Sequence, residues 1–457
     1  MEPQDLNLAI CGHAWHGKST LLGKLVAECG MATQREVEEA HRQASDGRDP
    51  SLVFAQLVFR SKDTTHGDSE AARGITILPS IVRFEFPDSR VTVIDTPGQE
   101  TYTNNRFFGM FQADAALLVV DVKHRVQPIT RQVIRILRGF EIPLKAVVLT
   151  KMDQVGYAQE PFLETVAQVR KVCEEYEVDA GQAAFIPASA YAPDRQLHEL
   201  GEGLTQFTRT PWYDGPTVRD FLKGLSFAAL RPREAPLRLA IHGSEVYDHV
   251  PGIGKTATAL VETGVVRADM VLQFEPVSRE RNKPVTARVR SVQLTRGHFA
   301  TPGVPLEEGV PRQLVGLAFK NLSEKDSLRE LFKGRGAIAG TVDHPPRVGQ
   351  RLVLELTVFD KDTLLHKGGQ WTMHVHVDRV PVQVETMLER RAADGGPWKT
   401  CRPEDPIAVG EWGRMEVTTV TRPVAIEEAA TVPQLAKIVL RLENKAVAYG
   451  RCIKVLA

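Results

Sequence analysis

The sequence predicts a multi-domain protein in which an α/β domain, with a mostly parallel sheet and helices on both faces, precedes two antiparallel β-barrels. A glycine-rich loop lies between an apolar run and a helix-forming stretch near the N-terminus, and apolar, β-branched runs recur up to residue 190. After residue 236, short β-rich runs are broken by glycine. The length of 457 residues fits about three domains, and a content of 42% hydrophobic and 25% charged residues is typical of a globular chain.

The glycine-rich loop is a complete phosphate-binding loop. Residues 12–19 match the pattern G-x-x-x-x-G-K-[ST], follow the apolar run Leu6–Cys11 and precede the helical stretch Thr20–Glu28. The glycines leave backbone N–H groups free to wrap the β-phosphate, the Lys18 ammonium reaches the β- and γ-oxygens, and the Ser19 hydroxyl ligates Mg²⁺. The loop residues expected to contact a nucleoside triphosphate are His13, Ala14, Trp15, His16, Gly17, Lys18, Ser19 and Thr20.

A second strand is expected to bring an acid to the same site. The β-branched run Val91–Ile94 ends in Asp95, and Thr-Pro-Gly98 follows. At a strand end, the Asp95 carboxylate would face Mg²⁺ and the N–H of Gly98 would lie near the γ-phosphate. The sequence therefore predicts a second wall of the metal site.

Two further segments predict that the base is guanine. The strand ending at Thr150 continues as Lys151-Met-Asp153, a T-K-x-D variant of the N-K-x-D element. The Asp153 carboxylate can accept from both the N1–H and the 2-amino group of guanine, a donor pair that adenine lacks. The Thr150 hydroxyl, in place of the usual asparagine, can make one hydrogen bond that braces the phosphate loop.

A third strand leads into an S-A loop whose backbone N–H can donate to guanine O6. This loop contains Ser189, Ala190 and Tyr191.

In this order, the segments resemble those of translational GTPases, so the first domain is identified as a P-loop GTPase domain. Arg73-Gly-Ile-Thr76-Ile looks like the R-G-I-T-I switch element of that family. The resemblance implies that the Thr76 hydroxyl meets Mg²⁺ and that its N–H meets the γ-phosphate, so that only the triphosphate can hold this loop. The expected ligands are GTP or GDP and Mg²⁺. The expected metal-binding residues are Ser19, Thr76 and Asp95.

The resemblance to elongation factor 1-alpha spans essentially the whole chain. The segment Ser51–Phe59 is similar to its helical insert, which is shorter in elongation factor Tu, and Pro211–Thr217 looks like the segment that closes its GTPase domain. Val261–Gly264 and Val315–Leu322 resemble its second domain, and the apolar/polar alternation between residues 335 and 450 matches its last barrel in outline. We therefore expect a GTP-binding domain at 1–226 and β-barrels at 236–325 and 333–457.

The residues around the γ-phosphate depart from this family. After Gly98, translational GTPases such as elongation factor 1-alpha carry a histidine that orients the attacking water, whereas this chain has Gln99. Glutamine here resembles the water-orienting residue of small signalling GTPases, and its amide does not titrate. Ala14 and Trp15 replace the usual valine and aspartate, so altered intrinsic hydrolysis is expected. The expected catalytic residues are Gln99, Lys18 and Thr76.

Composition and charge indicate the expected cellular location of the protein and the classes of partner that are not expected. No stretch approaches ~18 apolar residues, so no membrane span is expected. The first residues do not resemble a signal peptide, and five scattered cysteines without metal spacing favour a reducing compartment, with the cytoplasm as the expected location. The formal net charge of zero gives no support for a broad nucleic-acid surface, and no DNA partner is expected.

The resemblance implies a GTPase that delivers aminoacyl-tRNA to the ribosome and is stimulated by a partner such as the ribosome. An exchange factor is a further candidate partner, and a monomer is expected. Three alternatives stay open: a specialised paralogue with another cargo, such as a partner of a release or rescue factor; the GTPase subunit of ATP sulfurylase; and a binding module with little turnover. The segment Pro211–Tyr213 favours the sulfurylase subunit and Val261–Gly264 disfavours it, while Gln99 permits the binding module.

Overall fold

The structure of the chain, a computed structural model, consists of two compact units, Met1–Ala228 and Ala229–Ala457. The first contains a large apolar core, and the second contains a core in each of two separate regions. The expected switch residues Arg73 and Gly74, and residues 321–322 of the expected second-domain segment, lie outside the part of the chain that the structure describes. The structure describes residues 4–45, 52–58, 75–77, 79–191, 199–226, 232–250, 252–275, 285–294, 304–320, 328, 337–360, 362–376, 378–392, 396–443 and 445–456.

The first unit is built on a sheet with the strand order β2-β3-β1-β4-β5-β6. All neighbouring strands pair in parallel except β2, which runs antiparallel to β3 at one edge. Most residues of these strands are apolar or β-branched and can be buried on both faces, as in β4, where every residue is buried. The strands are β1 (Gln4–Cys11), β2 (Ser80–Glu85), β3 (Ser89–Asp95), β4 (Ala115–Asp121), β5 (Leu144–Thr150) and β6 (Ala184–Pro187).

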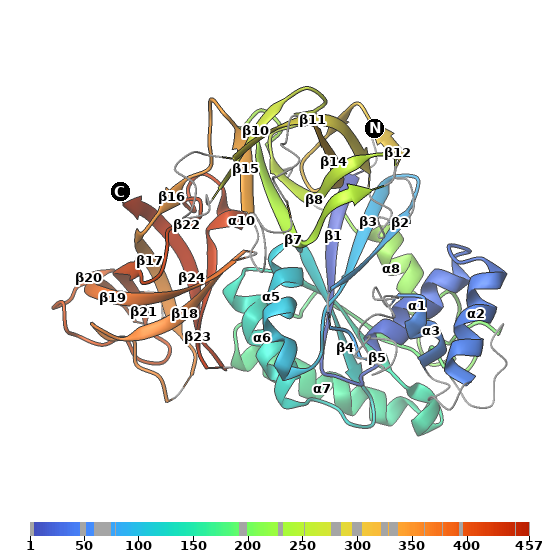
Figure 1. The fold of residues 1–457 in the computed structure, drawn as a ribbon. Coiled ribbons are helices and arrows are strands. Elements are labelled where there is room, and N and C mark those ends of the chain that lie inside the picture. The colour runs from blue at the N-terminus through green and yellow to red at the C-terminus, as the bar shows by residue number, and fades with distance from the viewer. Residues whose placement is uncertain are drawn as a thin grey trace. The chain divides into compact units, whose positions relative to one another are not determined.

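Helices cover both faces of this sheet, as predicted: Figure 1 shows α5 and α6 on one face and α1 and α8 on the other. Leu21, Leu22 and Leu25 of α1 join Leu8 and Val93 of the sheet in one core. The helices are α1 (Lys18–Glu28), α2 (Gln34–Ser45), α3 (Val53–Gln56), α5 (Thr103–Phe111), α6 (Pro128–Gly139), α7 (Gln159–Glu175) and α8 (Val218–Gly224), with 3₁₀ turns η2 (Glu100–Tyr102) and η3 (Met152–Val155).

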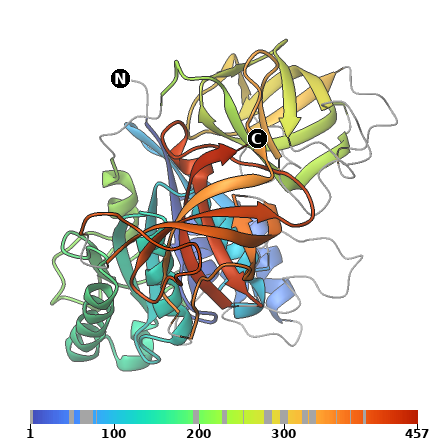
Figure 2. The same ribbon diagram turned by 90° about the vertical axis from the view of Figure 1, so that its left-hand side faces the viewer.

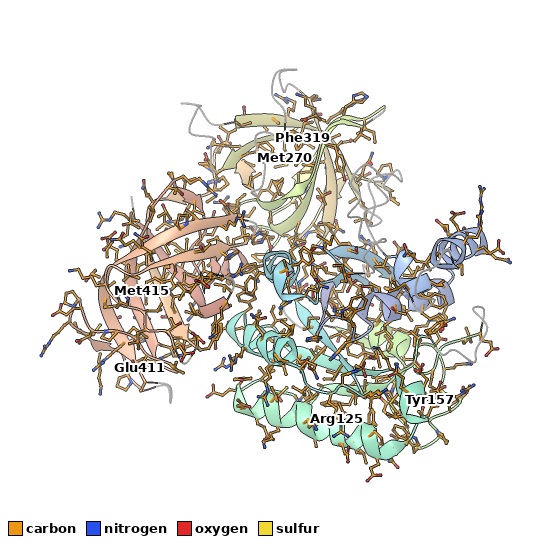
Figure 3. The ribbon with its side chains drawn as sticks, turned by 60° about the horizontal axis from the view of Figure 1, so that its bottom comes forward. Arg125, Tyr157, Met270, Phe319, Glu411 and Met415 are labelled. Carbon is orange, nitrogen blue, oxygen red and sulfur yellow. The ribbon has the colours of Figure 1, made fainter. Side chains whose placement is uncertain are left out.

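The first barrel is an antiparallel ring in the second unit. Among the described residues, the ring follows the order β10-β15-β7-β8-β14-β11 and closes where β11 pairs with β10. Phe274 and Phe319 meet edge to face in its core, with ring centroids 5.6 Å apart; Figure 3 labels Phe319. The strands are β7 (Arg238–Val250), β8 (Gly254–Thr263), β9 (Val266–Arg267), β10 (Val271–Glu275), β11 (Val285–Leu294), β12 (Val304–Leu306), β13 (Glu308–Gly309), β14 (Leu314–Lys320) and β15 (Ala337–Thr341).

Strand β15 pairs with β7 and β10 of the first barrel, although it lies in the range 333–457 expected for the last barrel. The first barrel is therefore completed by a strand that comes after the expected boundary. The sequence ranges of the domains stay predictions.

The second barrel is also an antiparallel ring in the described residues, with the order β18-β23-β24-β17-β21-β19 closed by the pairing of β19 with β18. Figure 2 shows its strands in orange to red. Leu352, Leu354, Leu356 and Met415, the last labelled in Figure 3, are fully buried in its core. Its elements are β16 (Val348–Gly349), β17 (Arg351–Val358), β18 (Gln370–Val375), β19 (Asp378–Arg391), β20 (Lys399–Thr400), β21 (Trp412–Thr419), β22 (Val424–Ala425), α10 (Pro433–Ala436), β23 (Lys437–Leu442) and β24 (Lys445–Leu456).

A buried ion pair joins the two barrels. Arg238 of β7 pairs with Glu427, which follows β22, and the two side chains are only 9% and 2% exposed. The guanidinium also donates to the carbonyl oxygens of His344 and Pro345 in the connection between the barrels, at 2.9 and 3.2 Å. Removing one partner would leave the other charge buried, which is costly in a low-dielectric interior.

We predict that Arg238→Met lowers the free energy of unfolding of the second unit by about 3–5 kcal/mol, because the Glu427 carboxylate loses its main cation while it stays buried. Urea unfolding of the full chain measures the loss. The control is Arg351→Met, since the Arg351 side chain is 56% exposed in its pair with Glu416, and its loss should cost less than about 1 kcal/mol. Equal losses in the two variants would contradict the role given to Arg238.

Candidate functional site

Two glycines shape the phosphate loop between β1 and α1. Gly12 and Gly17 have φ of +146° and +85°, which favours glycine at both positions. A Cβ on Gly12 would lie 2.3 Å from the carbonyl oxygen of Val119, so the loop leaves β1 in close contact with β4. The loop ends at the N-terminus of α1, where unpaired N–H groups and the helix dipole favour a phosphate.

Lys18 is a buried cation at the start of α1. Its side chain lies in the wall of the site, and Nζ donates to the carbonyl oxygen of His13 at 3.0 Å. Burial lowers the pKa of Lys18 to about 8, and the Asp95 carboxylate opposes this lowering. An anionic phosphate beside the ammonium would favour its charged form in the same way.

The three expected metal ligands meet beside Lys18. The Ser19 hydroxyl donates to Oδ2 of Asp95 at 2.5 Å and lies 2.8 Å from Oγ1 of Thr76, which in turn is 3.3 Å from the same carboxylate oxygen. These side chains come from α1, the end of β3 and the segment 75–77. Hydroxyl and carboxylate oxygens are the hard ligands that Mg²⁺ prefers, so this donor set fits a magnesium ion.

The two segments expected to recognise the base also meet. The Ser189 hydroxyl donates to Oδ1 of Asp153 at 2.6 Å, which ties the S-A loop to the T-K-x-D element. The Thr150 hydroxyl donates to the carbonyl oxygen of His16 at 2.7 Å. This is the brace on the phosphate loop that the sequence predicted for a threonine at that position.

Asp121, at the end of β4, holds the T-K-x-D element and was missed by the sequence analysis. Its carboxylate pairs with the Lys151 ammonium and with Nδ1 of His124, both at 2.8 Å. Burial alone would raise the pKa of Asp121, but the hydrogen bonds from Lys151 and His124 outweigh it and lower that pKa to about 2. The position could have been found, since Asp121 ends an apolar strand as Asp95 does.

One cavity of about 380 Å³ lies between these segments, a size typical of sites for small ligands. The predicted site residues that line it are Ala14, Trp15, Gly17, Lys18, Ser19, Thr20, Thr76, Gly98, Gln99, Thr150, Lys151, Asp153, Ala190 and Tyr191. The predicted site residues outside its lining are His13, His16, Asp95 and Ser189.

His16 does not line the cavity, and its side chain is buried. Its Nδ1 accepts from the backbone N–H of Asp121 at 3.2 Å, and burial lowers the pKa of His16 to about 3. The imidazole is therefore neutral at physiological pH and cannot supply a charge to a phosphate. That His16 contacts the nucleotide stays a prediction, which its backbone N–H would meet.

Three further residues that the sequence did not indicate line the same cavity: Leu52 and Ala55, at α3, form an apolar wall, and Gln154, in η3, adds a polar side chain. Phe54 of α3 packs on α1, where Lys24 Nζ lies 4.4 Å from the centre of its ring. The insert was recognised by its resemblance, but nothing in its spacing indicated that it would face the cavity.

Family models match two parts of the chain. The model described as "Elongation factor Tu GTP binding domain" matches residues 4–210, and the one described as "GTP-eEF1A C-terminal domain-like" matches residues 351–453. The first range contains every segment that lines the cavity.

Curated relatives match along the full chain. Elongation factor 1-alpha of Pyrococcus furiosus is 30% identical over 462 residues, with 99% of both chains covered. Elongation factor 1-alpha of Archaeoglobus fulgidus is 29% identical over 453 residues, with 98% of this chain and 97% of the relative covered.

Solved structures with the same fold include the GTPase-like domain of Ski7 from S. cerevisiae bound to GTP, with a TM-score of 0.73 at 18% identity over 98% of this chain and 97% of that one. Elongation factor SelB from Methanococcus maripaludis, in complex with the GTP analogue GppNHp, has a TM-score of 0.67 at 17% identity over 100% of this chain and 80% of that one. At these identities the likeness shows the fold alone. The family models and the full-length match to elongation factor 1-alpha show that the chain belongs to the elongation factor 1-alpha and elongation factor Tu family of translational GTPases.

Proposed function

We propose that this chain delivers aminoacyl-tRNA to the ribosome in a GTP-dependent manner and hydrolyses GTP to GDP and phosphate when the ribosome stimulates it. The observation that carries the proposal is that the phosphate loop, Ser19, Thr76 and Asp153 line one cavity. Asp95 and Ser189 are hydrogen-bonded to these lining residues from outside it. The full-length similarity to elongation factor 1-alpha supports aminoacyl-tRNA as the cargo.

In this proposal, the phosphates lie against the loop N–H groups and the Lys18 ammonium. Ser19, Thr76 and Asp95 hold Mg²⁺, whose charge neutralises the phosphate oxygens. Because Thr76 belongs to a switch segment, its place in the metal site depends on the γ-phosphate, and hydrolysis would release it.

Gln99 is the proposed water-orienting residue. It lines the cavity next to Gly98, and its amide can accept from water and donate to a γ-phosphate oxygen without changing charge. With Lys18 and Thr76 it forms the proposed catalytic set. Hydrolysis then lacks the pH dependence that a histidine would give.

Asp153 is the proposed guanine-selecting residue, with the backbone N–H of Ala190 directed at guanine O6. Ser189 orients the Asp153 carboxylate through its 2.6 Å hydrogen bond, and Tyr191 lines the cavity beside it.

The cellular location, the oligomeric state and an exchange factor belong to the same proposal. We propose a cytoplasmic monomer whose GDP release is assisted by a guanine nucleotide exchange factor. No helix in the described part of the chain combines the length and apolarity that crossing a bilayer requires.

A specialised paralogue with another cargo is the second candidate, favoured by Trp15. This residue takes the place of the usual aspartate, has φ of +63°, and leaves 56% of its surface exposed at the wall of the cavity. A large exposed aromatic side chain beside the nucleotide suits contact with a different partner.

The insert helix α3 is proposed to retain the bound nucleotide. A Cβ on Gly23 of α1 would lie 1.8 Å from the carbonyl oxygen of Phe54, so α3 sits on a surface that only glycine permits. Leu52 and Ala55 reach the cavity from this position. A shift of α3 would therefore open the apolar wall.

We predict that Asp153→Asn weakens GTP binding by about 10- to 100-fold, because the amide oxygen can still accept from guanine N1–H but the amide N–H₂ is set against the guanine 2-amino group, donor against donor. Affinity for xanthosine triphosphate should rise, since xanthine has a carbonyl in place of the 2-amino group. Titration with fluorescent nucleotides measures both. Asp179→Asn, at an exposed turn, should leave GTP affinity unchanged, and no loss in Asp153→Asn would remove the proposed role.

We predict that Gly23→Ala speeds the release of both GDP and GTP by about 5- to 30-fold, the effect of about 1–2 kcal/mol of overpacking, because the added methyl group displaces α3. Stopped-flow release of a fluorescent nucleotide measures the rates. Gly224→Ala is the matched control, since a Cβ at this helical glycine meets nothing within 4 Å. An unchanged rate in Gly23→Ala would disprove the retaining role of α3.

Delivery of aminoacyl-tRNA is tested by protection of the aminoacyl ester. The full chain bound to a non-hydrolysable GTP analogue is expected to slow spontaneous deacylation of bulk aminoacyl-tRNA, and the GDP form is expected to protect it much less, because the switch segment is released. Binding of uncharged tRNA serves as the control. Absence of protection in the triphosphate form would refute delivery and favour the paralogue with another cargo.

A further inference from the structure

Arg106 is a fully buried arginine in α5, the helix that follows the loop carrying Gln99. Its Nε donates to the carbonyl oxygen of Pro97 at 2.9 Å, and its Nη2 donates to the carbonyl oxygen of Gln99 at 2.8 Å. Its Nη1 donates to Oε1 of Gln132 in α6 at 3.0 Å. One guanidinium therefore connects the loop to two helices that lie on the same face of the sheet (Figure 1).

The carbonyl group of Gly98, which lies between those of Pro97 and Gln99, is held by the phosphate loop. The backbone N–H of Ala14 donates to the carbonyl oxygen of Gly98 at 3.1 Å. A Cβ on Gly98 would lie 2.4 Å from Nζ of Lys18 and 2.6 Å from the nitrogen of Ala14, so the two loops are in close backbone contact. The carbonyl groups of residues 97, 98 and 99 are thus all hydrogen-bonded, and the peptide planes on both sides of Gln99 Cα are constrained. The backbone N–H of Tyr102 also donates to the carbonyl of Gln99, at 3.2 Å.

This contact set points to a role beyond filling the interior. Arginine is rarely fully buried unless its donors are satisfied, and hydrogen bonds from a charged donor are about twice as strong as neutral ones. Here two of those bonds are made to the segment from which Gln99 reaches the nucleotide cavity. The planar fork of the guanidinium suits two carbonyls two residues apart, whereas a lysine ammonium cannot span them in a fixed geometry.

The charge of Arg106 also affects the pKa of Lys18 in the phosphate site. Burial is the main cause that lowers the pKa of Lys18 to about 8, and the nearby charge of Arg106 acts in the same direction. A variant that removes the guanidinium therefore changes both loop geometry and local charge, and the test has to separate the two.

We propose that Arg106 is a positioning residue for GTP hydrolysis: it clamps the backbone at Pro97 and Gln99 so that the Gln99 amide is held at the place of the attacking water, with Gln132 as the outer anchor of the clamp. This inference rests on the water-orienting role proposed for Gln99. A misplaced catalytic group can cost about 10²-fold in rate, so the clamp acts on the rate of the chemical step.

The test is single-turnover hydrolysis of GTP by the full chain, without ribosomes, in wild type, Gln99→Ala, Arg106→Met and the double variant. Arg106→Met is expected to lower the rate constant about 10- to 100-fold. If Arg106 acts through Gln99, the double variant is no slower than Gln99→Ala alone. Arg106→Lys keeps the charge and loses the fork, and it should be slowed nearly as much as Arg106→Met.

Gln132 provides a variant that does not disturb the core, since its side chain is only half-buried. Gln132→Leu removes the outer anchor and should lower the rate constant by a smaller factor, again with no effect in the Gln99→Ala background. Gln132→Glu keeps an acceptor and should retain the wild-type rate. Arg135→Met, which removes a half-buried arginine of the same helix from its contacts with Tyr176, is the matched control and should also retain it.

The outcomes separate the two claims. If Gln99→Ala hydrolyses GTP at the wild-type rate, the water-orienting role and the clamp both fail. If Gln99→Ala is slow but Arg106→Met is not, or if Arg106→Met slows the reaction by the same factor with and without Gln99, the clamp alone is wrong. A fall in Arg106→Met that Arg106→Lys fully reverses would assign the effect to charge and also overturn the clamp.

Discussion

Parallel strand pairing in a fixed register is the constraint on which the site depends. Backbone hydrogen bonds align Ile10 of β1 with Asp95 of β3, and Asp121 of β4 with Thr150 of β5. Because the carboxyl ends of parallel strands meet at the same edge of a sheet, the residues that follow each strand must lie together there. The phosphate loop, the Asp95 loop and the base-recognition loops are therefore gathered by main-chain geometry before any side chain contacts a ligand.

Close backbone contact between these loops is the second level of the arrangement. Gly12 lies against β4 and Gly98 lies against the phosphate loop, with no room for a side chain at either position. Two buried cations beside this contact are hydrogen-bonded to main-chain atoms: Lys18 to the carbonyl of His13, and Arg106 to the carbonyls of Pro97 and Gln99. Buried charge here fixes loop geometry, which is what a site that orients a water molecule requires.

The second unit is built from closed antiparallel barrels instead of an open, mostly parallel sheet. Among the described residues, each barrel closes its ring of strands by pairing the first with the last, and the inward side chains of alternating positions fill its interior. The joint between the barrels contains charge: Arg238 and Glu427 form a buried pair, and the same guanidinium holds the connecting segment. A paired charge at such a place favours one arrangement of the two barrels over others, since a shift that separates Arg238 from Glu427 would break a buried ion pair.

The sequence determined the features that depend on local spacing. The glycines and Lys18 of the phosphate loop, the acid at the end of β3, the Asp153 element and the brace by Thr150 could all be predicted, because each is a residue type at a fixed distance from a strand or helix end. The tertiary structure decided the contacts between distant segments: the pairing of Asp121 with Lys151, the position of α3 at the cavity, the clamp by Arg106, and the closing of the first barrel by β15. These could not be predicted because burial and strand pairing are chosen among many compatible partners, and the choice depends on how the whole chain packs.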